Sequence, residues 1–384
     1  MTDQTDVREF LHRMANEAGF APVEPGPVVR QARRRLARTV GGTLLMAGAL
    51  VAGALVAANE LMTAARSQMP QPGIPADRPV EPRPGPVTSG ALAYALNGDI
   101  YVADPDGSNA VKIADATADA ECEGITEYSI PSWSPDGRYL AFQRDCTSLE
   151  QTAVVITDPH GNAVAEFPRD GWGFTWSPDS TRVAVWETDF ETIAVYGVDG
   201  ERQTSLPLPP ITGGANDAAP GWMPDGSALL LYGYVVVPLD GSAEHELSLG
   251  GQATYSPDGT RVAVVKRNST TVIDADGAPV SEVDARVFPE AWSSDGDRFA
   301  EGDGELRVVD AASGTVTVLT EARAALDAGD EILGVEGFSP QGDRILYATG
   351  DGVGGNTALW SIGVDGSDAR LLVAGTTQGE WRSR

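Results

Sequence analysis

The sequence predicts an all-β fold, a β-propeller of four-stranded blades preceded by one transmembrane helix. An aromatic-Ser-Pro-Asp-Gly motif, with minor variations, recurs six times after residue 90 at spacings of 43, 46, 33, 37 and 46 residues. A run rich in β-branched residues follows most copies, as in RVAVW and RVAVV. Repeats near 40 residues that contain several short strands are typical of propeller blades. Residues 40–58 carry no charge and supply the predicted transmembrane helix.

Charge is distributed unevenly along the 384 residues. The formal net charge is −28, yet residues 1–40 contain seven Arg against five acids, which leaves 20 bases and 50 acids for the rest. Such a negative field repels nucleic acid and attracts cations or basic proteins. We therefore expect no nucleic-acid partner and expect a protein partner that is basic.

Residues 1–39 are predicted to form a cytoplasmic tail with a short amphipathic helix. Apolar residues recur there at helical spacing, and Gly19 is a stop signal. A helix of this length is marginal in water on its own, so it either binds a partner or frays. The apolar positions are Val7, Phe10, Leu11, Met14 and Ala18.

Residues 40–58 form the predicted membrane span, because a helix of this length covers roughly 28 Å. Five arginines precede it and Glu60 follows it, so the positive-inside rule places the N-terminus in the cytoplasm and the repeats outside. A cleaved signal peptide is the alternative, since Val56-Ala57-Ala58 fits a cleavage pattern, although its charged region is long for a signal peptide. The arginines are Arg30, Arg33, Arg34, Arg35 and Arg38.

Residues 59–89 are predicted to form an extracytoplasmic stalk. Seven prolines lie between residues 66 and 89. Proline at this density favours extended polyproline II structure, which is semi-rigid.

Residues 90–384 contain the repeats, and the motif residues have a structural role in this prediction. Proline presets the first turn position, aspartate bonds nearby amides, glycine takes the left-handed position and the aromatic residue packs between sheets. The repeat residues are Trp133, Asp136, Gly137, Trp176, Asp179, Trp222, Asp225, Gly226, Asp258, Gly259, Trp292, Asp295, Gly296 and Trp381.

A second signature, a strand that ends in an Asp-Gly turn such as Asp199-Gly200, occurs seven times. Together the two signatures give four strands per blade. Trp381 resembles a seventh inner strand, and ALAYA, DIYVA and AVKIA supply the other three strands of its blade. This 3+1 closure leaves no open edge and favours seven blades, with six as the alternative.

The segments WSPDGRYLAF, TWSPDSTRVAVW and TYSPDGTRVAVV resemble the PD40 (WD40-like) repeats of TolB-like propellers. The resemblance covers about three quarters of the chain and implies the fold and a general habit of binding proteins. TolB's amino-terminal α/β domain has no counterpart here, so a Tol-Pal role is not implied.

The sequence contains few residue patterns that are typical of an enzyme active site. No Gly-x-Ser-x-Gly elbow occurs and the chain has three histidines, so we predict no enzyme, no catalytic residues and no cofactor. Asp104-Pro-Asp106-Gly107 and Asp274-Ala-Asp276-Gly277 could bind calcium or could form turns. A downstream glutamate at EF-hand spacing is missing from both, and we assign no metal residues.

Strand order places the motif turns and the Asp-Gly turns on one face of the propeller and the longer loops on the other. The loop before the second blade carries Asp119, Glu121, Glu123 and Glu127, the candidate binding residues for a basic or cation-bridged partner. Cys122 and Cys146 project from the same blade and form a candidate disulfide. The alternative is that these loops are only solvated and that binding occurs around the central channel.

The predicted function is a membrane-anchored extracytoplasmic propeller that acts as a non-enzymatic scaffold for a protein or ligand in the cell envelope. The alternative is a transmembrane regulator, in which the propeller senses outside and the tail holds a cytoplasmic factor. The order of tail, anchor and sensor resembles that of anti-sigma regulators, although their His/Cys zinc pattern is absent from residues 1–40.

Overall fold

The structure is a computed structural model that describes residues 90–116, 126–147, 152–168, 173–186, 192–207, 220–326, 329–351 and 357–383. The predicted tail, transmembrane helix and stalk lie outside these residues. Across the described ranges, no helix has the length and apolar character needed to cross a membrane.

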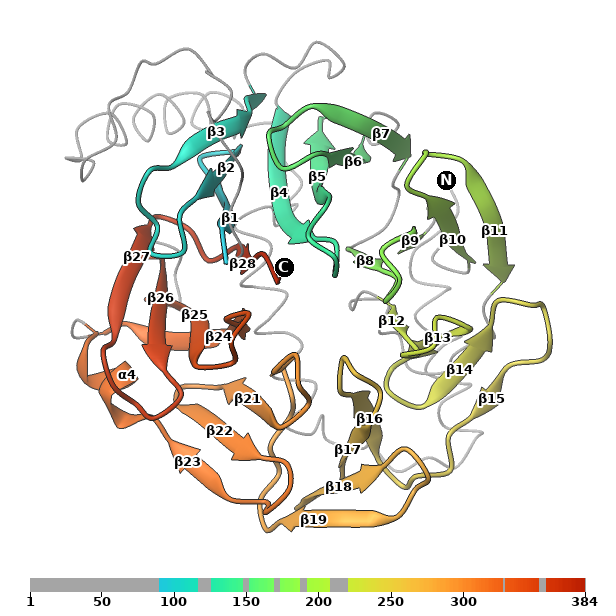
Figure 1. Cartoon of the computed structure of the whole chain (residues 1–384), viewed down its shortest axis with the longest axis vertical. Coiled ribbons are helices and arrows are strands. Elements are labelled where there is room, and N and C mark those ends of the chain that lie inside the picture. The colour runs from blue at the N-terminus through green and yellow to red at the C-terminus, as the bar shows by residue number, and fades with distance from the viewer. Residues whose placement is uncertain are drawn as a thin grey trace, which may run out of the picture. The chain divides into compact units, whose positions relative to one another are not determined.

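Seven four-stranded antiparallel sheets form the described part of the chain, and they follow one another around a ring (Figure 1). The prediction of an all-β propeller with seven four-stranded blades is confirmed. Blade 1 contains β28 (Gly379–Trp381), β1 (Leu92–Leu96), β2 (Asp99–Ala103) and β3 (Val111–Ala114). Blade 2 contains β4 (Thr126–Trp133), β5 (Leu140–Cys146), β6 (Ala153–Thr157) and β7 (Ala163–Pro168).

The next three blades continue in chain order. Blade 3 contains β8 (Phe174–Trp176), β9 (Arg182–Trp186), β10 (Thr192–Gly197) and β11 (Arg202–Pro207). Blade 4 contains β12 (Gly221–Trp222), β13 (Ala228–Leu231), β14 (Val235–Pro238) and β15 (His245–Glu246). Blade 5 contains β16 (Gln252–Tyr255), β17 (Arg261–Val265), β18 (Thr270–Asp274) and β19 (Pro279–Val283).

Blade 6 contains β20 (Ala291–Trp292), β21 (Arg298–Gly302), β22 (Leu306–Asp310) and β23 (Val316–Val318). The short helix α4 (Thr320–Ala324) follows it and buries Ala322. Blade 7 contains β24 (Glu331–Phe338), β25 (Arg344–Gly350), β26 (Ala358–Gly363) and β27 (Arg370–Ala374).

The antiparallel order gives the propeller two distinct faces. The turns that join the first strand of a blade to its second, and the third to its fourth, lie on one face, which we call the turn face. The turns between the middle strands and the connections to the next blade lie on the other, which we call the loop face. The aromatic motifs occupy the turn face because each follows an inner strand.

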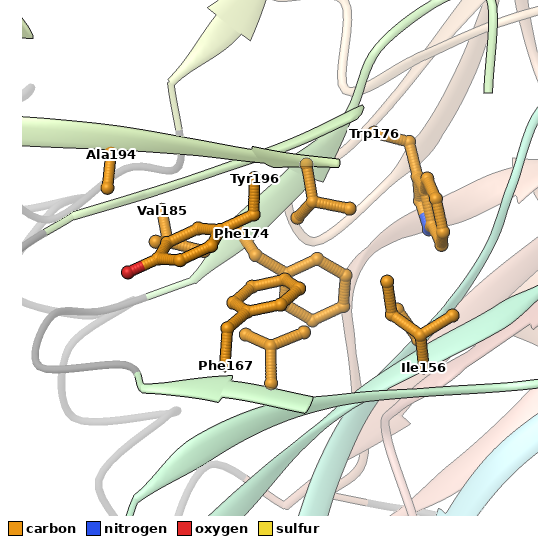
Figure 2. Packing of buried hydrophobic residues seen from close by; sticks show 10 residues of the cluster. Ile156, Phe167, Phe174, Trp176, Val185, Ala194 and Tyr196 are labelled. Atoms are coloured by element: carbon orange, nitrogen blue, oxygen red, sulfur yellow. The ribbon is translucent and has the colours of Figure 1, made fainter. Parts of the chain in front are cut away.

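The hydrophobic core lies between neighbouring blades. Figure 2 shows one such contact, in which Phe167 of blade 2 lies next to Tyr196 of blade 3 and Ile156 of blade 2 lies toward Trp176 of blade 3. The rings of Phe167 and Tyr196 stack with centroids 4.3 Å apart and an interplanar angle of 6°. Burial of such aromatic and β-branched side chains supplies the main force that holds one blade against the next.

The motif turn has a defined hydrogen-bond network that explains its sequence. Ser177 is fully buried, donates its hydroxyl proton to Asp179 at 2.6 Å and accepts a bond from the backbone N–H of Arg182 at 2.9 Å. Asp179 also accepts the backbone N–H of Thr181 at 3.0 Å. The same bond from the motif serine to the motif aspartate occurs at Ser134, Ser256 and Ser293.

Two of the six motif copies depart from this network, and blade 1 has no copy of the motif. In blade 7, Gln341 occupies the aspartate position, and Ser339 donates instead to Asp343 at 2.7 Å. In blade 4, Met223 occupies the serine position. The inner and outer strands of blade 4, β12 and β15, are also only two residues long each. Blade 4 is therefore held by fewer local hydrogen bonds than the others.

Strand β28 lies between β1 and β4. It pairs with β1 through its backbone, with Leu92 opposite Trp381. The side chain of Gln378, just before β28, reaches β4, whose pairing register with β5 shifts between Ser129 and Ser132. Gln378 Oε1 accepts the backbone N–H of Ile130 at 2.9 Å. Residues from the two ends of the propeller sequence are thus held together by backbone and side-chain bonds.

Candidate functional site

The acidic loop predicted to bind a partner is only partly described. Asp119, Glu121 and Glu123 lie outside the described residues. Glu127 lies in β4, is exposed and pairs across the strand with Asp145 of β5. Ser129 donates its hydroxyl proton to Asp145 at 2.8 Å. The structure therefore brings Glu127 and Asp145 together, an acidic pair that the sequence alone did not reveal because it arises from strand register.

The start of the loop is anchored to blade 1. Asp99 Oδ1 accepts the backbone N–H of Ala116 at 2.9 Å, and Asp99 Oδ2 lies 2.7 Å from Lys112 Nζ. Tyr128 at the other end donates its backbone N–H to Gly98 O at 2.8 Å. Both ends of the loop are therefore hydrogen-bonded to residues at the β1–β2 turn. This limits the conformational entropy that the loop would lose when a partner binds.

Cys146 ends β5 and is disulfide-bonded. It lies directly opposite Thr126 in the β4–β5 pairing, and Thr126 follows Cys122 by four residues in the sequence. Cys122 itself lies outside the described residues, and its pairing with Cys146 stays a prediction.

An ion pair between a buried arginine and an exposed glutamate lies close to Cys146. Arg144 is only 6% exposed, and its guanidinium donates to both carboxylate oxygens of Glu166 in β7 at 2.9 and 2.6 Å. A two-point bond of this kind fixes orientation as well as position. It holds the loop-face end of β5 against the outer strand β7, and no local sequence pattern predicts it.

The aromatic repeat residues hold neighbouring blades together. The indole N–H of Trp176 in blade 3 donates to Ser132 O in blade 2 at 3.1 Å, and that of Trp222 in blade 4 donates to Thr175 O in blade 3 at 3.3 Å. The indole N–H of Trp381 instead donates within blade 1, to Pro105 O in the β2–β3 turn, at 3.1 Å. The indole nitrogens of Trp133 and Trp292 are buried and have no hydrogen-bond partner in the described ranges.

The repeat aspartates and glycines form the motif turns. The hydroxyl of Ser293 and the backbone N–H of Asp297 hold the pKa of Asp295 below its ordinary value. Asp136, Asp225 and Asp258 accept the backbone N–H two residues later in the same way. The glycines have φ between 68° and 72°, the left-handed region that favours glycine. They are Gly137, Gly226, Gly259 and Gly296.

The two Asp-x-Asp-Gly segments form turns on the turn face. Asp106 Oδ1 accepts bonds from the backbone N–H and the hydroxyl of Ser108, at 3.0 and 2.6 Å. Asp274 Oδ1 accepts the backbone N–H groups of Asp276 and Ala278. Within the described ranges, no three His, Cys, Asp or Glu residues cluster in a way that could hold a metal ion.

Glu301 in blade 6 has a buried carboxylate that was not predicted from the sequence. Glu301 is 3% exposed, and its Oε1 accepts the backbone N–H of Phe288 at 3.1 Å. Burial raises its pKa, which the Phe288 N–H and the guanidinium groups of Arg307 and Arg286 lower only in part. Alignment of the repeats could have revealed it, because five other blades have apolar residues there: Phe142, Val185, Leu231, Val264 and Tyr347.

Comparison with known proteins identifies no family for the chain. No protein-family model matches the chain, and no curated protein matches it. Among solved structures, a crystal structure of the eukaryotic initiation factor is 13% identical with a TM-score of 0.44. A provisionally assigned 6-phosphogluconolactonase from Bacteroides uniformis is 13% identical with a TM-score of 0.47. Each match covers 76% of this chain and 98% of the other.

Proposed function

We propose that this protein is a non-enzymatic binding scaffold that recognises a protein partner through the loop face of its propeller. The supporting observation is the anchored acidic segment between blades 1 and 2. Both of its ends are hydrogen-bonded to the β1–β2 turn, and Glu127 and Asp145 stand together at its base. Binding sites commonly lie on loops that a rigid scaffold positions.

The proposed partner is basic, or bridged to the loop by a cation. The full chain carries −28, and the loop adds Asp119, Glu121 and Glu123 to the described acids. A disulfide between Cys122 and Cys146 would hold this surface in one arrangement before binding. Calcium is an alternative bridge, and loss of partner capture on chelation would identify it.

The proposal places the propeller outside the cytoplasm. The uncharged segment 40–58 and the arginines before it favour a single-pass anchor with a cytoplasmic N-terminus. The resemblance to TolB-like PD40 repeats supports a role in protein binding in the cell envelope. The ring would be closed in the 3+1 manner by strand β28.

Site-specific cross-linking tests this function. The full-length protein would be expressed in a native membrane with a photo-cross-linkable residue at Glu123, and captured proteins would be identified by mass spectrometry. The matched control carries the same residue at Asp276, an acid on the turn face. A partner captured at Glu123 and not at Asp276 supports the scaffold, whereas equal capture at both positions overturns it.

A transmembrane regulator is the second candidate, and it is favoured by the apolar stripe in residues 7–18 and by the order of tail, anchor and propeller. The same experiment with the cross-linkable residue at Phe10 distinguishes it. Capture of a transcription factor at Phe10 alone would replace the scaffold proposal with the regulator.

A further inference from the structure

Three cationic side chains at the loop-face end of blade 5 have no ion pair and no side-chain hydrogen bond within the described part of the chain. Lys266 and Arg267 lie exposed in the β17–β18 turn, and Arg286 lies half-buried in the connection that follows β19. This is unusual in a chain with 55 acids and 27 bases, where most cations can find a carboxylate. Their charges are therefore available to a ligand.

The segment that carries Arg286 is held by side-chain hydrogen bonds at Val287 and Glu290, which follow Arg286. The hydroxyl of Thr270 donates to Val287 O at 2.8 Å and accepts the Val287 N–H at 3.0 Å. Further along, Glu290 Oε2 accepts the backbone N–H groups of Gly302 at 3.1 Å and Val335 at 2.8 Å. Arg286 thus projects from a connection fixed to blades 5, 6 and 7, and little backbone entropy would be lost when it binds.

Arg307 lies in the same region and is only partly paired. It faces Glu301 across β21 and β22, and its NH2 lies 3.3 Å from Glu301 Oε2. Among the residues that the structure describes, its Nε is buried without a hydrogen-bond partner, as is Glu301 Oε2. Phe288, two residues after Arg286, donates its backbone N–H to Glu301 Oε1 at 3.1 Å, so the segment that carries Arg286 lies beside the Arg307–Glu301 pair. Within the described residues Glu301 pairs with Arg307, and the guanidinium of Arg286 has no ion pair, so its hydrogen-bond donors are available.

We propose that Arg286 and Arg307, flanked by Lys266 and Arg267, bind carboxylate groups of an acidic peptide segment. Guanidinium groups suit this role because they donate paired hydrogen bonds to carboxylates. The spread of the four cations over two blades suits an extended segment, and the exposed acids Asp284 and Asp303 at the border restrict its register. The inference rests on the proposed function and adds the chemistry of a second contact.

The four cations Lys266, Arg267, Arg286 and Arg307 lie on the side of the ring opposite to β4. Blades 5 and 6 lie across the ring from β4 (Figure 1). A partner that spans the loop face would therefore place a basic segment on one side and an acidic segment on the other. Opposite charges at two separate points also fix the orientation of the partner.

The test measures fluorescence anisotropy of a labelled peptide of alternating Glu and Gly with the full-length protein in detergent. Arg286→Gln is expected to weaken binding about tenfold, since a bond to a charged group contributes about 1.5–3 kcal/mol and 1.4 kcal/mol corresponds to tenfold. The control is Arg138→Gln, an exposed arginine on the turn face that pairs with Asp136. It should leave binding unchanged.

A second variant, Lys266→Gln with Arg267→Gln, changes only exposed turn residues and guards against misfolding of Arg286→Gln. It should weaken binding at least threefold. Equal binding by wild type and both variants, or displacement of the peptide by an equal concentration of inorganic phosphate, would overturn the proposal. Cross-linking at Glu123 is unaffected by that outcome, so the two proposals fail separately.

Discussion

Glu380 Oε2 accepts a hydrogen bond from the backbone N–H of Trp133 at 3.0 Å, although 247 residues separate the two in sequence. The bond connects the inner strand of blade 1 to that of blade 2. Glu380 retains some accessible surface, but protein atoms surround its carboxylate closely. This burial raises its pKa to about 7, and the bonds from Ser132 and Trp133 lower it only in part.

Glu380→Gln should therefore change how stability depends on pH. The folded-state pKa lies above the unfolded value, so wild type loses stability as the pH rises from about 4.5 to about 7. The loss should be on the order of 1–3 kcal/mol. Glutamine still accepts the Trp133 N–H but does not ionise, so the variant should lack this loss. Urea unfolding at pH 5, 6, 7 and 8 measures it, with exposed Glu305→Gln as the control. Parallel pH profiles for wild type and Glu380→Gln would contradict the assignment.

Ser177→Ala should destabilise the propeller by about 2 kcal/mol, because it removes a buried hydroxyl and leaves the Arg182 N–H without its acceptor. Ser227→Ala is the matched control. Its hydroxyl also bonds the motif aspartate, Asp225, at 2.7 Å, but that bond is exposed. The control should cost less than about 0.5 kcal/mol. Chemical denaturation of both variants decides the point, and equal losses would show that burial of the serine is unimportant.

Gly107→Ala and Gly277→Ala should differ, although both glycines end an Asp-x-Asp-Gly turn with φ near 80°. A Cβ at Gly107 would lie 2.7 Å from Leu372 O in blade 7, whereas a Cβ at Gly277 would meet nothing within 4 Å. Both changes cost about 1 kcal/mol of backbone strain, and Gly107→Ala should cost a further 1–3 kcal/mol for the collision. Thermal unfolding measures the difference. Equal midpoints would mean that the blades do not approach as closely as described.

Removal of the predicted disulfide should lower stability and weaken partner capture. If Cys146 pairs with Cys122, the bond closes a loop of about 25 residues and should contribute about 3 kcal/mol. Cys122→Ser with Cys146→Ser should show this loss in urea unfolding. Peptide mapping without reductant tests the pairing directly, and two thiols that react with maleimide in the folded wild type would exclude it.

The sequence predicted the blades well because the motif turns are built from local contacts. Ser177, Asp179 and Arg182 lie within six residues, so their chemistry can be recognised in the chain. The same holds for the Asp-Gly turns. The number of blades followed from counting these turns.

Contacts between blades, and between strands that are distant in sequence, could not be predicted in this way. Glu290 bonds Val335, and Arg144 bonds Glu166, only because strand register and blade packing bring them together. Glu301 has an apolar counterpart in five other blades, and only a residue-by-residue alignment of the repeats singles it out. The acidic loop was recognised by composition, whereas its acidic neighbour Asp145 depends on pairing across β4 and β5.

The short inner and outer strands of blade 4 affect where the ring would open first. With two-residue inner and outer strands and no motif serine, it should have the lowest free energy of local opening. Amide protons of Val235 to Val237 should then exchange with solvent before those of corresponding strands elsewhere. A protease added under native conditions would cut first in this blade, and forced unfolding of the propeller would begin there.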